Sequence, residues 1–597
     1  MTKRTFRGAE YLVSRPTKDD VFAPEDMTEE QRHIGRVAEG FVREHVFPKH
    51  ERIERHEFDV VVELFRECGR LGLLMIDAPE AYGGLELDKV TSWHAAEKMG
   101  LAGSFSVSYS AHTGIATLPL VYYGTEAQKQ RYLTRIVSGE WIAAYCLTEP
   151  DSGSDALGAR AVATRSPDGK HWVLNGTKQF ITNGSIADVF TVFAKVDREL
   201  FTAFLVERTF PGVKIGAEEK KLGIRGSSTT QVVLEDAKVP LENVLGEIGK
   251  GHKIAFNVLN VGRAKLGAAV TGAAKLAFEQ GVAYANARRQ FGKPIARFGA
   301  IQEKIADMAA GIYAAESVVY RLAGLVDDRL AALPKGAPAP DHYDAVQRGI
   351  EEYAVECAIA KVFCSDVLAA VVDEVVQIHG GYGFIQEYPA ERYYRDERIN
   401  RIFEGTNEIN RLLVSGTILR RAAKGDFPLR EEALRAAEAL SRRGEARAEG
   451  SSEPFGEERA LLARLKDLFL LAAGAAAQRL REQVKEEQEV LLALADVAIL
   501  VFALESAVLR AARAHARSGE AKRALTAGAV KVLAFDGAER IASAARKAAF
   551  FAAEGDALKL LLAAIPRLAA YDASGLLQAK RRLAEAALEA ERYVLAP

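Results

Sequence analysis

The chain has 597 residues, of which 49% are hydrophobic, so it is too long for a single core and is expected to form several domains. The 79 Lys and Arg nearly balance the 81 Asp and Glu, which leaves a formal net charge of -2. This balance provides no basic surface for nonspecific polyanion binding, so no nucleic-acid partner is expected. Four cysteines without a CxxC pair indicate reduced thiols and not a disulfide framework.

The chain shows no secretory or membrane signal. Lys3, Arg4 and Arg7 are not followed by an apolar stretch, and Glu10 argues against a transit peptide, so we expect a cytoplasmic protein. The longest nearly apolar run, residues 490–504, is interrupted by Asp496 and is shorter than the ~20 residues that a membrane span needs. No stable membrane insertion is expected.

The first domain is predicted to be helical and to span residues 27–144, because Ile34, Val37, Ala38 and Phe41 recur at helical spacing. Residues 145–250 then carry short β-branched and aromatic runs at 172–174, 189–196, 201–206 and 231–234, which predict a β domain. Between two of these runs, Asn175-Gly176 predicts a tight hairpin turn.

Helical periodicity returns over residues 251–420, interrupted by Pro334, Pro338 and Pro340, which predict a surface loop. We expect residues 421–456 to form a linker, since 441–456 are charged and contain Gly, Ser and Pro. A last helical domain is expected over 457–597. The predicted fold is therefore mainly α with an inserted β domain, which argues against a doubly wound nucleotide-binding fold. The sequence also lacks a GxGxxG after a strand and any cluster at metal-ligand spacing, so no metal site is expected.

Glu404 is a candidate general base. It follows the apolar pair Ile402 and Phe403, where poor solvation raises the pKa of a carboxyl toward a range useful for proton abstraction. Taken alone, the segment favours an exposed or helix-capping carboxylate. A loop rich in hydroxyls and small residues at 145–155, and the strand end at 178–184 with Phe180, could hold the polar and flat parts of a cofactor. The alternatives are a purely structural Ser/Gly turn and a Phe180 that packs in the core.

Five segments together carry a specific resemblance. They are Pro-Glu-Ala-Tyr-Gly-Gly at 79–84, Tyr-Cys-Leu-Thr-Glu-Pro at 145–150, Arg-Arg-Gln-Phe-Gly-Lys-Pro at 288–294, Gln-Ile-His-Gly-Gly at 377–381 and the Glu404 segment. In this order they resemble the acyl-CoA dehydrogenase family over about residues 27–419. The additional C-terminal helical region is similar to that of the very-long-chain branch.

The resemblance implies FAD as the cofactor. It places Tyr145, Leu147 and Thr148 beside one edge of the flavin, Phe180 and Thr182 at its other side, and Thr406 and Glu408 near it from the helical domain. It further implies at least a homodimer, in which several residues reach the FAD of the neighbouring subunit: Arg288, Gln290, Phe291, Gln377, Gly380 and Gly381.

For the substrate, the resemblance implies that Ser154, Asn260 and Arg263 contact the coenzyme A part of an acyl-CoA, although several relatives have Asp where this chain has Asn260. Ser106 and Ser110 match the segment that lines the acyl pocket and would leave a deep channel for a long chain. The alternative is that both serines only pack between helices. Phe403 would shape the same pocket.

By the same resemblance, Glu404 removes the α-proton of the acyl-CoA while the β-hydrogen leaves as hydride to the flavin, giving a trans-2-enoyl-CoA as in fatty acid β-oxidation. Electrons would pass to an electron-transfer flavoprotein. Two alternatives stay open: an acyl-CoA oxidase that uses O2, and an assembly or scaffold protein on the same fold.

Overall fold

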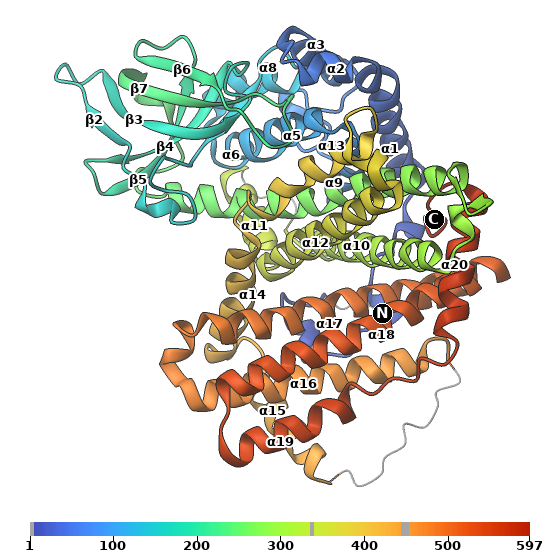
Figure 1. Cartoon of the computed structure of the whole chain (residues 1–597). Coiled ribbons are helices and arrows are strands. Elements are labelled where there is room, and N and C mark those ends of the chain that lie inside the picture. Colours follow the sequence, from blue (N-terminus) through green and yellow to red (C-terminus); the bar gives the residue numbers. More distant parts are fainter. Residues whose placement is uncertain (1–4, 335–338, 443–452) are drawn as a thin grey trace.

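The computed structural model describes residues 5–334, 339–442 and 453–597. In Figure 1 the β domain and the N-terminal helices lie on one side of a layer of long central helices, and the C-terminal helices cover the other side. The element order is helical, β, helical and again helical, so the predicted fold class is confirmed.

The N-terminal domain begins with a capped helix. Thr28 Oγ1 accepts a hydrogen bond from the Gln31 amide (3.2 Å) and Gln31 Oε1 accepts one from the Thr28 amide (2.9 Å), which satisfies two free N–H groups at the helix start. Ala38 and Phe41, from the predicted apolar stripe, are buried. The helices are α1 (Glu29–Phe41), α2 (His50–Glu54), α3 (Phe58–Arg70), α4 (Lys89–Met99), α5 (Ser104–Ser110), α6 (Thr117–Tyr123), α7 (Glu126–Gln128) and α8 (Thr134–Val137).

The β domain is an eight-stranded sheet in the order β6-β7-β3-β2-β4-β5-β8, with β1 paired in parallel to β4. The four predicted runs fall in β3, β4, β5 and β7, as the alternation of β-branched and aromatic residues indicated. The strands are β1 (Ala143–Cys146), β2 (Val162–Arg165), β3 (His171–Thr182), β4 (Val189–Val196), β5 (Leu200–Glu207), β6 (Val213–Glu218), β7 (Thr229–Pro240) and β8 (Val244–Leu245).

The predicted hairpin turn at Asn175-Gly176 is wrong, because both residues lie inside β3 at a shift in its pairing with β7. Asn175 exchanges two hydrogen bonds with Asp236 of the neighbouring strand. Gly176 has φ 151°, and a Cβ there would lie 2.7 Å from the Ala161 Cβ. The glycine therefore allows a close approach of two chain segments instead of a reversal.

The central layer contains the longest helices between residues 5 and 428. The helices are α9 (Gly251–Ala287), α10 (Gly299–Ala331), α11 (Ala339–Glu351), α12 (Ala354–His379), α13 (Pro389–Glu397) and α14 (Asn407–Ala423). The predicted proline loop is shorter than expected. Pro340 lies in the first turn of α11, where a missing N–H is tolerated, while Pro338 falls outside the described residues.

Part of the segment expected to be a linker is helical. This segment contains α15, whose buried apolar residues are Leu429, Ala433 and Ala436, and Phe427 is buried just before the helix. Residues 443–452 lie outside the described range. Spacing of three and four residues is what places such side chains on one helix face. The helices are α15 (Leu429–Arg442), α16 (Gly456–Leu480), α17 (Gln488–His515), α18 (Glu520–Ala552), α19 (Gly555–Leu568) and α20 (Leu576–Ala590).

Residues 5–26 hold the C-terminal domain to the central helices, a role that their sequence did not predict. The Tyr11 hydroxyl donates to the Ala498 carbonyl on α17 (2.9 Å). On the other side, the Ala9 amide donates to Glu356 Oε1 (2.6 Å) and the Tyr353 hydroxyl donates to the Phe6 carbonyl (2.8 Å). The segment therefore lies between α12 and α17 and is bonded to both.

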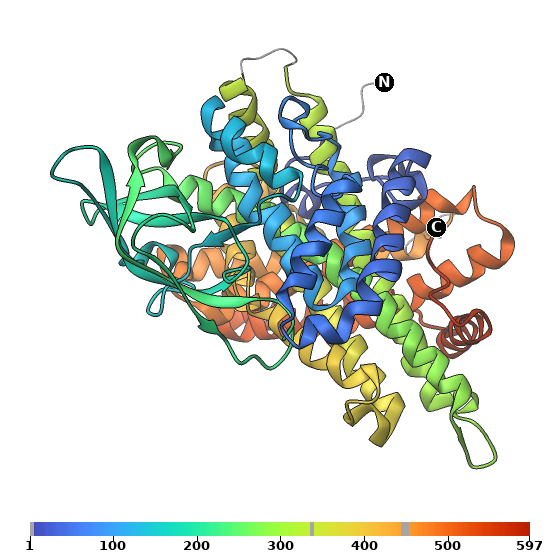
Figure 2. The same ribbon diagram turned by 90° about the horizontal axis from the view of Figure 1, so that it is seen from above.

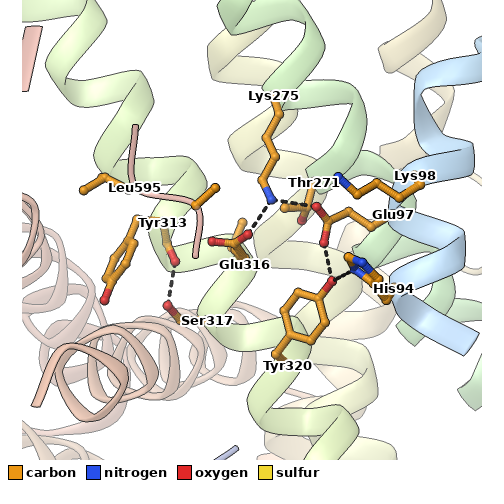
Figure 3. Close-up of polar contacts among 12 residues, drawn as sticks. His94, Glu97, Lys98, Thr271, Lys275, Tyr313, Glu316, Ser317, Tyr320 and Leu595 are labelled. Carbon is orange, nitrogen blue, oxygen red and sulfur yellow. Dashed lines mark hydrogen bonds and ion pairs between the residues drawn. The ribbon is translucent and has the colours of Figure 1, made fainter. Parts of the chain in front are cut away.

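A cluster of buried charges joins three helices, one from the N-terminal domain and two from the central layer (Figure 3). Lys275 of α9 pairs with Glu97 of α4 and with Glu316 of α10. The Tyr320 hydroxyl bonds Glu97 Oε2 at 2.5 Å and lies 2.6 Å from His94 Nδ1. The four cysteines are also buried, and all are free thiols, as predicted.

Among the described residues, α17 is the one helix that is long and apolar enough to cross a membrane. It is also the central helix of the C-terminal domain, and 83% of its most apolar window is buried inside the fold. This burial is what the core helix of a globular domain shows.

Candidate active site

One cavity of about 3060 Å³ brings together residues from every part of the catalytic region. Cavities that hold a single small ligand are usually about 300–1,000 Å³, so this one has room for two large molecules. The cavity also reaches α14, α15 and α16. The sequence-predicted residues on its lining are Ser106, Ser110, Tyr145, Leu147, Thr148, Ser154, Phe180, Thr182, Asn260, Arg263, Phe403, Glu404 and Thr406.

Glu404 lies in a tight loop just before α14. Its φ is +58° and that of Gly405 is +80°. A side-chain-bearing residue in this left-handed region is strained unless its surroundings hold it, and such strain is concentrated at functional sites. Here the Glu404 carbonyl accepts hydrogen bonds from Arg263 Nε (3.2 Å) and Asn410 Nδ2 (3.3 Å). Thr406 then caps α14, with Oγ1 accepting from the Ile409 amide.

Lys361 of α12 also holds this loop, and the sequence analysis missed it. Its Nζ donates to the Gly405 carbonyl (2.8 Å) and to Asn407 Oδ1 (2.6 Å). Burial lowers the pKa of Lys361 to about 8, against the opposing effect of the Glu404 carboxylate. The sequence did contain a signal, since Lys361 is a single cation within the apolar stretch 357–364.

The Glu404 carboxyl points into the cavity with one oxygen unpaired. Oε2 is buried and makes no hydrogen bond to any described residue. Burial raises the pKa of Glu404 to about 7, while the nearby charges of Arg263 and Lys361 act in the opposite direction. A carboxyl with a pKa near neutrality and a free oxygen can exchange a proton with a bound ligand.

The wall opposite Glu404 is formed by the β domain. Tyr145, at the end of β1, has a buried hydroxyl without a partner among the described residues. Phe180 has φ +58° and is 62% exposed, so its ring faces the cavity instead of the sheet core. Both features fit a flat cofactor with polar edges, because such a ring could stack on Phe180 and bond the free hydroxyl.

A buried ion pair fixes this wall. Lys178 of β3 contacts Glu149 at 2.6 Å and also donates to the Leu147 carbonyl at 3.2 Å. The Thr148 carbonyl accepts from the Gln179 amide (2.8 Å). The loop that carries Leu147 and Thr148 is thereby tied to the strand that carries Phe180 and Thr182.

On the substrate side, Asn260 and Arg263 are both buried on α9 and bonded to each other, Arg263 Nη1 to Asn260 Oδ1 at 3.1 Å. Arg263 therefore holds the Glu404 loop as well as lining the cavity. Ser106 is buried on α5, Ser110 lies one turn further along, and Ser154 is exposed on the loop after β1. The structure does not assign a ligand contact to any of the three serines.

The structure does not bring the remaining predicted residues to this cavity. Glu408 lies exposed on the first turn of α14, outside the lining. The other six lie near the connection between α9 and α10 and the end of α12: Arg288, Gln290, Phe291, Gln377, Gly380 and Gly381. Figure 2 shows the α9–α10 connection projecting at the end of the molecule opposite the β domain.

The same two segments carry exposed aromatic side chains. Phe291 is 93% exposed and Phe384 is 85% exposed, while Arg288 lies over the ring of Tyr382 at 5.3 Å. The short hairpin of β9 (Arg289–Gln290) and β10 (Lys293–Pro294) carries Phe291 at its tip. We call Phe291, Tyr382 and Phe384 the aromatic surface.

Four family models match successive parts of the chain: the acyl-CoA dehydrogenase N-terminal domain over residues 28–140, the middle domain over 144–237, and two C-terminal domains over 249–419 and 464–567. A Bacillus subtilis protein described as a probable acyl-CoA dehydrogenase is 48% identical over 591 residues, covering 99% of this chain and 98% of that protein.

The mouse very long-chain specific acyl-CoA dehydrogenase is 41% identical over 415 residues, which cover 67% of this chain and 60% of the mouse protein. A crystal structure of an acyl-CoA dehydrogenase from Bacillus anthracis complexed with FAD has a TM-score of 0.96 at 48% identity and covers 99% of this chain and 100% of that one. The chain therefore belongs to the acyl-CoA dehydrogenase family.

Proposed function

We propose that this protein is an FAD-dependent enzyme that converts a fatty acyl-CoA to the trans-2-enoyl-CoA, as in fatty acid β-oxidation, with Glu404 as the base. The observation that carries the proposal is the unpaired, buried oxygen of Glu404 in the cavity that Thr148, Phe180 and Thr182 also line. Family membership and the FAD-complexed relative support the cofactor and the reaction class.

Glu404 acts in its ionised form, in which its carboxylate accepts the α-proton of the thioester. Because its pKa is about 7, the ionised form is well populated at neutral pH and the carboxylate is still basic enough to take a proton. Arg263 and Lys361 hold the loop through its carbonyls, so that the carboxyl keeps its direction into the cavity.

FAD, when bound, supplies the acceptor for the β-hydride. Tyr145, Leu147 and Thr148 would hold one edge of the flavin, and Phe180 and Thr182 its other side. Thr406, at the start of α14, would contact it from the base side. The apolar side chain of Phe403 limits water beside the reacting carbons, which keeps Glu404 poorly solvated.

We further propose that the substrate is a long-chain acyl-CoA. Ser106 and Ser110 leave space along α5, and the large cavity volume supports this choice. Asn260, Arg263 and Ser154 would contact the coenzyme A part. Comparing kcat/KM for butyryl-, octanoyl- and palmitoyl-CoA tests the chain length, and a butyryl-CoA optimum would contradict it.

The aromatic surface supports a homodimer as the working form, because an exposed group of aromatic side chains is typical of a subunit interface. In the dimer, Arg288, Gln290, Phe291, Gln377, Gly380 and Gly381 would reach the FAD of the neighbouring subunit. We also propose a cytoplasmic location, supported by the four free, buried thiols.

The visible spectrum of the purified protein tests the function. Under anaerobic conditions, palmitoyl-CoA should bleach the flavin absorption, and electrons should then pass to an electron-transfer flavoprotein. A protein that stays colourless after addition of FAD would contradict the enzyme and favour a scaffold. Rapid formation of H2O2 without the flavoprotein acceptor would identify an oxidase.

A further inference from the structure

Asp496 is the single charged residue in the apolar run 490–504 of α17, the core helix of the C-terminal domain. A charged side chain in such a helix reduces the free energy that is gained by burying the helix, unless the charge has a partner. Its partner is Arg411 of α14, whose Nε donates to Asp496 Oδ1 at 2.7 Å. The carboxylate thus connects the C-terminal domain to the helix that begins directly after the Glu404 loop.

Arg411 continues this connection toward the catalytic region. Its Nη2 donates to Asp366 Oδ2 on α12 at 2.9 Å. The other oxygen of Asp366, Oδ1, accepts from Asn407 Nδ2 at 2.9 Å. Arg411 therefore bridges two carboxylates, one from the C-terminal domain and one from the catalytic helices.

The last bonds reach the backbone next to Glu404. Asn407 Oδ1 accepts from Lys361 Nζ at 2.6 Å, and the same ammonium group donates to the Gly405 carbonyl at 2.8 Å. An unbroken series of hydrogen bonds thus runs from α17 to the carbonyl of Gly405, the residue after Glu404. We call the side chains of Asp496, Arg411, Asp366, Asn407 and Lys361 the positioning chain.

We propose that Asp496 and Arg411 are positioning residues, through which the C-terminal domain holds the strained Glu404 loop in its catalytic geometry. The proposal rests on the proposed role of Glu404 as the base. It assigns a function to the C-terminal domain, which lies across the layer of central helices from the β domain (Figure 1).

The solvent exposure of the positioning chain determines which properties of the protein should change when one of its residues is replaced. The side chains of Arg411, Asp366 and Asp496 are 21%, 34% and 42% exposed, so these ion pairs contribute little to global stability. Catalysis is more sensitive, because a displacement of about 1 Å of a reacting group can lower a rate by about 100-fold. Removing Asp496 should therefore affect turnover much more than melting temperature.

Asp496→Leu suits the test because leucine continues the apolar face of α17. Asp496→Glu is the conservative variant that should restore the contact. The control is Lys580→Met, which removes another partly exposed contact of the C-terminal domain, from α20 to Glu303 (3.0 Å) and Asp307 of α10. That contact lies outside the positioning chain.

The first measurement is hydrogen exchange of the backbone amides at residues 399–410. Asp496→Leu and Arg411→Gln should each speed exchange there by about fivefold, while Asp496→Glu and Lys580→Met leave it at the wild-type rate. This readout does not depend on turnover, so it tests the positioning chain even if the protein fails to dehydrogenate acyl-CoA. Unchanged exchange in Asp496→Leu would overturn the proposal.

The second measurement is steady-state kinetics of the FAD-loaded enzyme. Asp496→Leu should lower kcat by about tenfold and change KM for the acyl-CoA by less than about twofold. The double variant with Arg411→Gln should be no slower than the slower single variant, because both act through one series of bonds. If the effects of the two single variants on kcat multiply in the double variant, the two residues do not act through one series of bonds, which would contradict the proposal. If Lys580→Met lowers kcat as much as Asp496→Leu does, the cause is a general loss of structure, which would also contradict it.

Discussion

Gly262 of α9 lies directly against the carboxyl group of Glu404. A Cβ at position 262 would come within 2.9 Å of Glu404 Oε2 and 3.2 Å of its carboxyl carbon. The same Cβ would lie 3.1 Å from Ile115 Cγ2, so the space cannot open on the other side. The glycine thus leaves the space that Glu404 Oε2 occupies.

Gly262→Ala should therefore displace the Glu404 carboxyl and lower kcat by about 10- to 100-fold, since base and substrate lose their alignment. FAD content should stay unchanged, because the glycine faces the base and not the β domain. The matched control is Gly416→Ala on α14, which also lines the cavity but has no heavy atom within 4 Å of an added Cβ. Equal activity of both variants would show that the close approach is not needed.

Turnover should depend on pH through the ionisation of Glu404. Its pKa is about 7 because of burial, so kcat should rise as the pH increases through 7 and the base loses its proton. Lys361 lowers the pKa of Glu404 by favouring the carboxylate. In Lys361→Met the midpoint of the pH–kcat profile should accordingly move upward, by about one unit.

The pH dependence of stability should report on His94 in the buried charge cluster. Burial lowers the pKa of His94 to about 4 from a usual value near 6.5. The unfolded chain therefore takes up a proton at higher pH than the folded one. The contribution of His94 to the free energy of unfolding should therefore be fully present above pH 6.5. It should fall by up to about 3 kcal/mol as the pH decreases from 6.5 to 4.

His94→Asn should remove the part of the loss of stability at acidic pH that His94 causes. Asparagine keeps a hydrogen-bonding atom near Tyr320 but does not titrate. Urea unfolding at pH 7, 5.5 and 4 measures it as the free energy of unfolding. The variant should be less stable than the wild type at pH 7 but show a smaller decrease toward pH 4. Parallel curves for both proteins would assign the acid loss to another group, such as His112, whose pKa burial also lowers to about 4.

The aromatic surface should control assembly. Phe291→Glu places a charge on the tip of the β9–β10 hairpin, and we expect it to weaken the dimer and reduce FAD retention, because Arg288 and Gln290 lie beside it. Light scattering and the flavin content after gel filtration measure both effects. Leu577→Glu on α20, where the side chain is 56% exposed, is the control and should do neither.

The parts of the site that sequence predicted are carried by short contiguous segments. Glu404, Thr148 and Phe180 were predicted because several such segments occur together in one order, and none of these segments is decisive by itself. Gly262, Lys361 and Asp496 were not predicted as site residues, because their roles depend on contacts with residues more than 40 positions away. Their nearest neighbours in sequence only indicate helices.

The errors in the predicted fold have the same origin. Asn175-Gly176 is a common turn dipeptide, and only the approach of Ala161 and the pairing with Asp236 show that the chain continues straight. The linker prediction gave weight to the charged residues after 441 and overlooked the apolar face of α15, which is stabilised by packing on α16. The type of each element was predicted well where the residues that are buried are the ones that the local spacing of apolar residues indicates.

The central claim is that Glu404 removes the α-proton, and the reductive half-reaction of Glu404→Gln tests it most directly. Glutamine keeps the size of the side chain and the backbone bonds to Arg263 and Asn410, so the variant should still bind FAD and palmitoyl-CoA. Mixed anaerobically in a stopped-flow spectrophotometer, it should keep its flavin absorption while the wild type bleaches. Bleaching of the variant at the wild-type rate would contradict the assignment of the base.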